Sequence, residues 1–202
     1  MFERISAIIV DRLEDKRIIQ METKEVCAYG LRQIFSTILN AGTMLLIGVF
    51  MHMTIEAILF TIAYIPIRIF SGGYHASTPQ RCWAFSAVML FMVLCIVKYT
   101  PEKYFWHLTA LSLIASIAIF SLSPVEDQNK PLDEKEHHVY HIRATLIMFS
   151  EIMIAIVIYI LQFKHILMLI EMVWCSLAVM LLLGECKNYR IEKKKEDIYL
   201  LK

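Results

Sequence analysis

Charged residues are scarce in this chain of 202 residues, at 19% against roughly 25% in ordinary soluble proteins. Between Ile34 and Val97 only three occur, where a soluble segment of that length would carry about 16. A soluble domain of this size could not cover so much apolar surface, and a hydrophobic content of 58% excludes intrinsic disorder. The net charge of +1 gives nucleic-acid binding little support. The composition therefore predicts a polytopic membrane protein.

The cysteine pattern lacks any sign of a disulfide framework. The number is odd and no CxxC pair occurs, so the thiols are predicted to be reduced. Four of them are most simply small apolar residues in or near helices, and Cys82 differs in its setting. The five are Cys27, Cys82, Cys95, Cys175 and Cys186.

The histidine-rich segment 134–141 lacks the arrangement of a zinc site. His137 and His141 are one helical turn apart, but no Glu lies between them in an HExxH pattern. A solvated helix face beside the membrane is favoured over a metal site. Neither a metal nor another cofactor is predicted.

Six stretches are apolar enough for membrane-spanning helices, which need about 20 residues each. The predicted fold is all-α, with the whole chain, 1–202, forming one membrane-embedded domain. Three connections are short enough for hairpins, and two longer polar connections cover 71–81 and 123–143. The six predicted spans are 34–51, 55–70, 82–97, 104–122, 144–162 and 166–183.

Lysine and arginine are distributed unevenly over this arrangement. With the N-terminus in the cytoplasm, seventeen of them lie on the cytoplasmic side, and only Lys98, Lys103 and Lys164 lie outside. The positive-inside rule therefore predicts that both termini and both long loops are cytoplasmic.

Charged segments flank the transmembrane region 34–183 on both sides. In 1–33, apolar residues near helical spacing predict an amphipathic helix. It could lie in the cytoplasmic membrane interface or pack on the protein itself, and the pattern favours neither. The segment 184–202 is predicted to be a solvated basic tail, which could attract membrane lipids of negative charge or an acidic peptide.

The loop between the second and third predicted spans has a distinctive geometry. Gly72-Gly73 permits positive φ, and Thr78-Pro79 is a helix-start signal with Thr78 as the N-cap. Because the flanking spans are the shortest, at about 16 residues, we expect the loop to dip into the cytoplasmic leaflet. Four spans with two re-entrant segments is the topological alternative.

The same loop carries a candidate catalytic pair. Cys82 falls in about the first turn of the third predicted span, where the helix N-terminus favours a thiolate. A turn could fold the imidazole of His75 back onto this sulfur, which is the minimal arrangement for nucleophilic thiol catalysis. From spacing alone, a packing cysteine and a hydrogen-bonding histidine are the commoner interpretation.

The pattern Arg68-x-x-Ser71-Gly72-Gly73-x-His75-Ala76-x5-Cys82 resembles the signature of the accessory gene regulator B (AgrB) family. These are membrane-embedded cysteine endopeptidases of Gram-positive bacteria. Chain length, the multi-span layout and the amphipathic N-terminal segment agree with the family. The segment 123–132 is similar to its Pro-rich loop after the fourth span.

The resemblance implies an enzyme of the bacterial cell membrane that acts in quorum sensing on an AgrD-type precursor peptide. Cys82 would be the nucleophile and His75 its general base. The thiolate would release the acidic C-terminal tail of the precursor and leave an acyl-enzyme thioester. A precursor side chain, Cys or sometimes Ser, would attack it and close a thiolactone or lactone ring. A homodimer is implied as well.

Other residues of the motif have supporting roles. Arg68 could be a snorkelling anchor or bind a substrate carboxylate, and Gly73 would serve backbone geometry. Backbone N–H groups around Gly72-Gly73 or at the start of the third span are candidate oxyanion donors. Lys130 could hold the acidic tail, although a solvated loop cation is the simpler interpretation. Candidates to orient the histidine are Ser71, Asp127 and Asn129.

Carboxylates inside the predicted spans support a rival hypothesis, an ion-coupled transporter or peptide exporter without peptidase activity. Glu56 and Glu171 are near enough to the outer span ends to be interfacial, and Glu151 is deeper with no evident partner. Against a transporter, the sequence has no internal repeat and no matching pair of broken helices.

Overall fold

The computed structural model describes residues 2–15, 23–74, 76, 78–126 and 132–200. The regular secondary structure of these residues is entirely helical. Their one β-type contact is an isolated bridge between Gly72 and Val125. The predicted all-α fold is confirmed. The helices are α1 (Phe2–Asp15), α2 (Lys24–Phe50), α3 (Thr54–Ser71), α4 (Pro79–Tyr99), the short 3₁₀ helix η2 (Glu102–Tyr104), α5 (Phe105–Leu122), α6 (Glu134–Ile160) and α7 (Lys164–Leu200).

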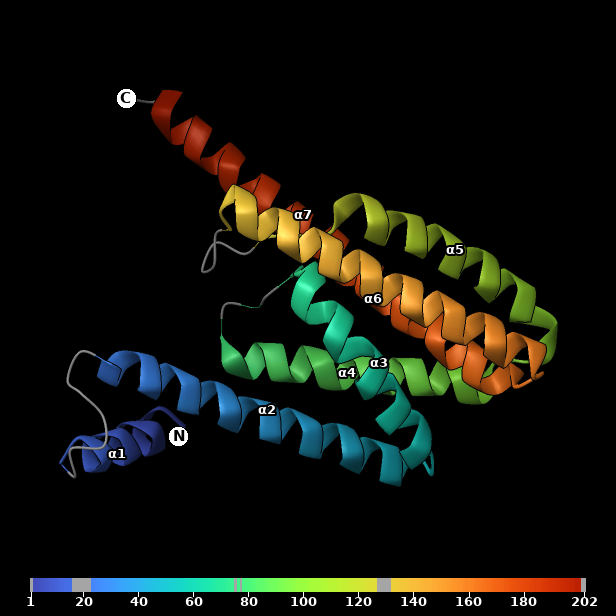
Figure 1. Cartoon of the computed structure of the whole chain (residues 1–202), viewed down its shortest axis with the longest axis horizontal. Helices are drawn as coiled ribbons and strands as arrows, with labels where there is room; N and C mark the ends of the chain where they lie inside the picture. Colours follow the sequence, from blue (N-terminus) through green and yellow to red (C-terminus); the bar gives the residue numbers. More distant parts are fainter. Residues whose placement is uncertain (1, 16–22, 75, 77, 127–131, 201–202) are drawn as a thin grey trace.

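The long helices run back and forth between two ends of the molecule (Figure 1). The α2–α3, α4–α5 and α6–α7 connections lie at one end, here called the hairpin end. The start of α1, the ends of α3, α5 and α7, and the starts of α4 and α6 lie at the other, the loop end. This arrangement agrees with the predicted grouping of both long loops with both termini.

Within the described parts of the chain, five helices are long and apolar enough to cross a membrane, namely α3, α4, η2 with α5, α6 and α7. The remaining predicted span corresponds to the second half of α2, whose apolar part, Ile34–Phe50, is shorter. Large apolar side chains point outwards from these helices, as at Phe50 and Ile55, which are 82% and 70% exposed. Such faces are suited to lipid rather than water, which supports a polytopic membrane protein.

Helix α4 is longer than the sequence predicted. It has 21 residues because it begins at Pro79, ahead of Arg81, and runs past Lys98. The expectation that both spans beside the loop are too short to cross a bilayer is therefore wrong for α4. The α3 helix has 18 residues. Both α3 and α4 are among the five candidate spans, which gives no support to the alternative of four spans with two re-entrant segments.

Helices α6 and α7 also extend beyond the predicted spans. Helix α6 begins at Glu134 rather than at residue 144, because Asp133 and Glu136 form a reciprocal capping box at its start. Helix α7 continues through Gly184 to Leu200, so most of the predicted solvated tail is helical. Glu and Lys, which dominate this segment, are good helix formers.

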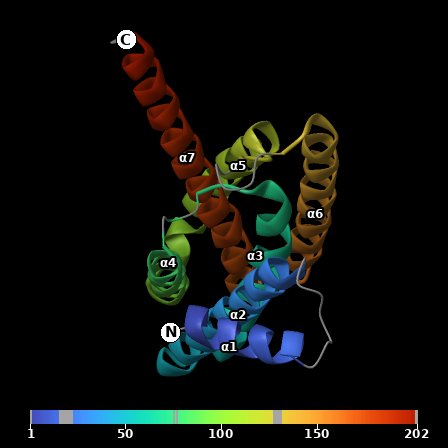
Figure 2. The same ribbon diagram turned by 90° about the vertical axis from the view of Figure 1, so that its left-hand side faces the viewer.

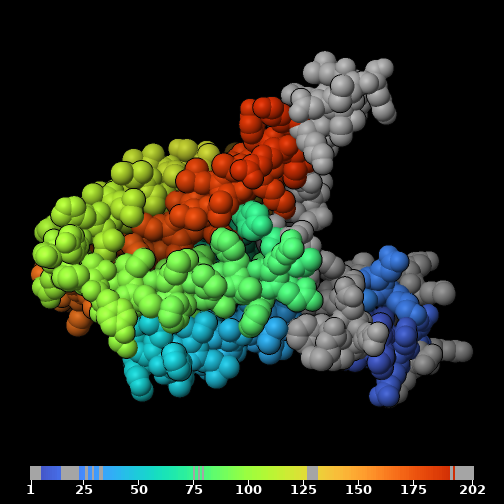
Figure 3. Space-filling view, turned by 180° about the vertical axis from the view of Figure 1, so that it is seen from behind, coloured from blue at the N-terminus to red at the C-terminus, as the bar shows by residue number. Residues whose placement is uncertain are grey.

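Helix α7 is the central helix of the bundle. Of its apolar window 67% is buried in the protein, against 22–28% for the other candidate spans. Figure 2 shows α3, α4, α5 and α6 arranged around it, and Figure 3 shows part of its surface between α4 and α5. Because α7 is enclosed on most sides, its apolar residues form no single stripe.

Among the intramembrane carboxylates, Glu56 and Glu151 each have a side-chain partner within the bundle. Trp174 Nε1 donates to the Glu151 carboxylate at 2.8 Å in the buried interior, which supplies the partner that the sequence did not reveal. At the hairpin end, Glu56 Oε1 lies 3.2 Å from His165 Nε2. Glu171, expected at the interface, is 2% exposed and thus enclosed by the protein.

The amphipathic helix α1 packs on the first part of α2. Ser6 and Val10 are buried, while Ile8 is 54% exposed. The Lys24 ammonium lies 2.9 Å from Asp11 and 2.6 Å from Glu14, and these carboxylates raise the pKa of Lys24 above its usual value. One face of α1 therefore packs on the protein itself, as the second of the two interpretations of its pattern expects.

Candidate active site

Cys82 lies in the first turn of α4, as predicted. The Arg81 N–H donates to Thr78 Oγ1 at 3.4 Å, Pro79 follows as the first helical residue, and the Cys82 N–H donates to the Thr78 carbonyl at 3.1 Å. The predicted N-cap is confirmed. This turn fixes the backbone from which the thiol projects.

Cys82 is the residue of this turn that faces the protein. It is half-buried, while the neighbouring residues in 80–85 are exposed. From Cys82, steps at helical spacing lead to half-buried Ser86 and then to the buried residues Leu90 and Leu94. The thiol thus begins the inward stripe of α4, on the side away from lipid.

The backbone conformation and close neighbours at positions 72 and 73 require glycine. Gly72 has φ +66° and Gly73 has φ +109°, values that favour glycine. A Cβ on Gly72 would collide with the Val125 carbonyl, and one on Gly73 would lie 2.5 Å from Arg68 Nη1 and 2.9 Å from the Met180 carbonyl. The pair therefore allows three parts of the chain to meet.

Those parts are the α3–α4 connection, the α5–α6 connection and α7. The Val125 N–H donates to the Ser71 carbonyl at 2.9 Å, and the Gly73 N–H donates to the Val125 carbonyl at 3.0 Å. The Tyr74 N–H donates to the Met180 carbonyl of α7 at 2.8 Å. The two polar loops, separate in the sequence, are thus one structural unit held on the central helix.

Side chains of α6 and α7 also hold the α5–α6 connection. His141 Nδ1 lies 2.6 Å from the Ser123 carbonyl, and Asn188 Nδ2 donates to the Glu126 carbonyl at 2.9 Å. His141, half of the histidine pair that suggested zinc, therefore contacts a backbone carbonyl. Among the described residues no group of three or more His, Cys, Asp or Glu side chains could hold a metal ion.

Unpaired buried polar atoms gather at the loop-end half of α3. The Arg68 guanidinium donates from Nη2 to the Tyr74 carbonyl, but Nη1 has no hydrogen-bond partner among the described residues. The same holds, within the described parts of the chain, for the buried hydroxyls of Tyr64 and Ser71. The Tyr74 ring in turn lies beside the Phe85 ring of α4, one helical turn after Cys82, with the ring centroids 5.7 Å apart.

The structure thus places Cys82, Arg68 and Gly73 at the loop end, with Ser71 and Gly72 beside Arg68 and Gly73. His75, Lys130, Asp127 and Asn129 lie outside the described residues. The N–H groups of Gly72 and Gly73 donate to the carbonyls of Arg68 and Val125, so these two of the candidate oxyanion donors are already hydrogen-bonded.

Sequence reasoning missed Tyr64 and Gly184. Tyr64 carried no motif signal, and its burial at one turn before Arg68 emerges only from packing. Gly184 lay where the last span was expected to end, but a Cβ there would lie 2.8 Å from the Tyr74 nitrogen and 2.9 Å from the Gly73 carbonyl carbon. A glycine inside a helix was the one available signal of this close approach.

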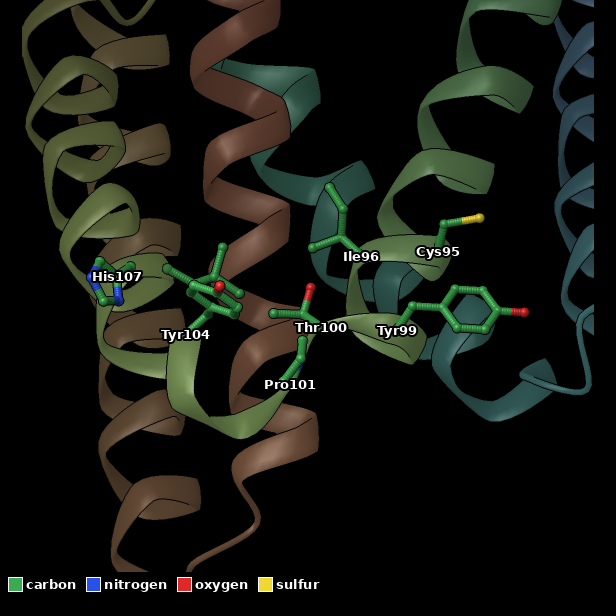
Figure 4. A pocket seen from close by; sticks show the side chains of 8 residues that line it. Cys95, Ile96, Tyr99, Thr100, Pro101, Tyr104 and His107 are labelled. Carbon is green, nitrogen blue, oxygen red and sulfur yellow. The ribbon is translucent and has the colours of Figure 1, made fainter.

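An apolar cavity lies far from this site, at the hairpin end between α4 and α5 (Figure 4). Its volume is about 640 Å³, and none of the predicted site residues lines it. Its lining comprises Cys95, Ile96, Tyr99, Thr100, Pro101, Tyr104, His107 and Leu108.

Comparison with known proteins gives a match over most of the chain. The sequence model described as "Accessory gene regulator B" matches residues 3–183. "Putative AgrB-like protein 2" of Clostridium perfringens (strain 13 / Type A) is 22% identical over 138 residues, which cover 65% of this chain and 64% of that protein. A second AgrB-like protein, from strain SM101 / Type A, has the same identity and coverage. The chain thus spans just under two thirds of these relatives. No solved structure matches.

Proposed function

Because the chain belongs to the accessory gene regulator B family, we propose that it is a membrane cysteine endopeptidase that processes a quorum-sensing propeptide. The substrate is an AgrD-type precursor, and the products are its C-terminal tail and a thiolactone or lactone ring. The enzyme acts in the bacterial cell membrane from the cytoplasmic side, as a homodimer.

The observation that carries the proposal is the placement of Cys82. The thiol belongs to the inward stripe of α4, in a capped first turn, and the preceding residues Gly73 and Tyr74 are hydrogen-bonded to Val125 and to Met180 of α7. An inward thiol in a rigid frame is suited to hold a peptide carbonyl at attacking distance.

The reaction begins with attack of the Cys82 thiolate on the carbonyl carbon before the tail of the precursor. The S–C bond forms and the carbonyl electron pair moves to the oxygen. Collapse of this intermediate restores the carbonyl and breaks the C–N bond. The His75 imidazolium gives its proton to the leaving amine, and an acyl thioester remains on Cys82.

A nucleophilic side chain of the precursor then completes the cycle. It gives its proton to His75 and attacks the thioester, and the Cys82 thiolate leaves as the ring closes. Exchange between two thioesters is nearly balanced in energy, so water must be excluded to prevent a linear product. The buried inward position of the site beside the bilayer favours this exclusion.

Cations around the site have a role in binding the acidic precursor tail. The Arg68 guanidinium, half-buried with one free Nη1 among the described residues, is suited to a carboxylate or a carbonyl oxygen. Lys130 is proposed as a second contact for the tail, and Ser71 as a hydrogen-bonding support. Gly72 and Gly73 keep the backbone in place.

Co-expression with the precursor tests the proposal. The mass of the precursor should fall by that of its C-terminal tail, and Cys82→Ala and His75→Ala should each abolish the change. Cleavage that survives in both variants would contradict the catalytic pair. A precursor that crosses the membrane at its full mass would instead support the ion-coupled transporter or exporter.

A further inference from the structure

The oxyanion of the proposed reaction needs hydrogen-bond donors, and the nearby backbone amides are engaged. The N–H groups of Gly72 and Gly73 donate to the carbonyls of Arg68 and Val125. At the start of α4, the N–H groups of Arg81 and Cys82 both donate to Thr78. These four amides are therefore engaged, and the buried side chains of α3 are a second source of donors.

Three buried side-chain donors of α3 have no hydrogen-bond partner among the described residues: the hydroxyls of Tyr64 and Ser71, and Arg68 Nη1. Ser71, the last residue of α3, is proposed above as a support, and Arg68 is linked to the start of α4 through Tyr74, whose ring lies beside that of Phe85. Tyr64 and Arg68 are one helical turn apart, so their side chains lie on the same side of α3. Among the described residues, neither the Tyr64 hydroxyl nor Arg68 Nη1 has a hydrogen-bond partner, although both are buried. A buried donor without a partner is unfavourable, so its retention indicates a role.

We propose that the Tyr64 hydroxyl and Arg68 Nη1 are the oxyanion donors that hold the carbonyl oxygen of the bond attacked by Cys82. This inference rests on the proposed function and adds Tyr64 to the catalytic residues. The Tyr64 ring stacks on Phe60 with centroids 5.3 Å apart, which fixes its direction. The Tyr74 carbonyl holds the other Arg68 nitrogen, which fixes the guanidinium.

The chemistry of the two donors suits both halves of the reaction. When the Cys82 sulfur attacks, the carbonyl electron pair moves to the oxygen, and the Tyr64 O–H and the Arg68 Nη1–H donate hydrogen bonds to it without transferring a proton. The same oxygen becomes negative again when the precursor side chain attacks the thioester. Loss of one donor should therefore slow both acylation and ring closure.

The variant Tyr64→Phe tests this inference, because it removes the hydroxyl and keeps the ring. We expect the single-turnover rate of Cys82 acylation to fall about 100-fold, and ring closure by a similar factor, as for loss of one oxyanion donor elsewhere. The KM for the precursor should change little, because the charge on the oxygen exists only in the transition state. The thermal midpoint in detergent should not fall, because the hydroxyl has no partner to lose in the described structure.

Tyr159→Phe is the matched control. Tyr159 lies near the end of α6 at the hairpin end and is 46% exposed, so the same chemical change there should leave both rates unaltered. Full acylation activity in Tyr64→Phe would overturn the inference. A loss of activity that matches a loss of folded protein would also overturn it. So would a pH–rate profile that shifts but keeps the same maximal rate, because such a shift would mean that Tyr64 acts through His75.

Failure of this inference can be told from failure of the proposed function. If Cys82→Ala abolishes cleavage and Tyr64→Phe does not slow it, the oxyanion assignment alone is wrong. If Cys82→Ala still cleaves the precursor, the proposed function itself is wrong. Both variants are measured with the full-length protein in the same detergent and with the same precursor.

Discussion

Gly184 shows how one residue can couple the central helix to the candidate site. It lies inside α7, where an added Cβ would meet the backbone of Tyr74 and Gly73 at 2.8 Å and 2.9 Å. On helix propensity alone, Ala would be more stable than Gly by about 1 kcal/mol. The close approach of α7 to residues 72–74, here called the glycine loop, therefore requires a glycine where helix propensity alone would favour alanine.

Gly184→Ala is predicted to slow precursor cleavage by about 10- to 100-fold, because the loop must move away from α7 and small displacements of a catalytic frame are costly. The measurement is the initial rate of tail release by purified protein in detergent. The Tyr74–Met180 hydrogen bond, at 2.8 Å, is the contact expected to break first.

Gly42→Ala is the matched control for this prediction. Gly42 lies inside α2, and an added Cβ has no heavy atom within 4 Å. Its cleavage rate should stay unchanged, and its thermal midpoint should hold or rise. Equal rates for both alanine variants would contradict the role assigned to Gly184.

At the residue scale, the sequence predicted the features that depend on residues a few positions apart. Thr78, Pro79 and Cys82 are a few positions apart, and a helix-start signal fixes their relation. Tyr64 and Gly184 depend on contacts between α3, α4 and α7, which are distant in sequence. No pattern within one segment contains that information.

The start of α4 is the feature of greatest consequence at the scale of single elements. Its first turn carries Cys82, and the Thr78 side chain is the cap that closes this turn. An N-cap of this kind contributes about 1 kcal/mol to helix stability. Loss of the cap should fray the turn and broaden the positions that the thiol can occupy.

Thr78→Ala is therefore predicted to lower the cleavage rate by a factor of about 5, the equivalent of the lost cap. Thr78→Ser keeps a side-chain oxygen and should retain nearly all activity. Helix content measured by circular dichroism should hardly differ between the two. A Thr78→Ala protein as active as Thr78→Ser would mean that the cap does not position Cys82.

Element boundaries were predictable where apolar residues define them and not where helix formers continue them. Helix α5, Phe105–Leu122, nearly coincides with the predicted span 104–122. Helix α7 was expected to end near residue 183 but continues to Leu200. A hydropathy pattern detects where a chain leaves the membrane, whereas Glu and Lys allow the helix itself to continue.

At the scale of the whole molecule, one central helix carries the contacts that unite the two loops. Helix α7 is enclosed by the bundle, and its Met180 and Gly184 meet the glycine loop. Hydropathy and charge predicted the apolar helices and the shared end at which α3 and α5 end and α4 and α6 begin, although only five of the described helices are long and apolar enough to cross a membrane. The central position of α7 was not, because a helix that is apolar all round does not reveal its neighbours.

The grouping of segments at two ends predicts a labelling pattern in intact cells. In a background without the native cysteines, Glu102→Cys and Gln162→Cys at the hairpin end should react with a membrane-impermeant maleimide. Asp133→Cys and Glu185→Cys at the loop end should react only after permeabilisation. The reverse pattern would place the candidate site outside the cell and contradict the positive-inside argument.

The most direct test of the central claim is the intact mass of the protein after brief mixing with its precursor. A thioester to Cys82 predicts an adduct equal to the precursor without its tail, which hydroxylamine removes and Cys82→Ala abolishes. Tail release by the Cys82→Ala protein, or an adduct that stays in that variant, would contradict the account.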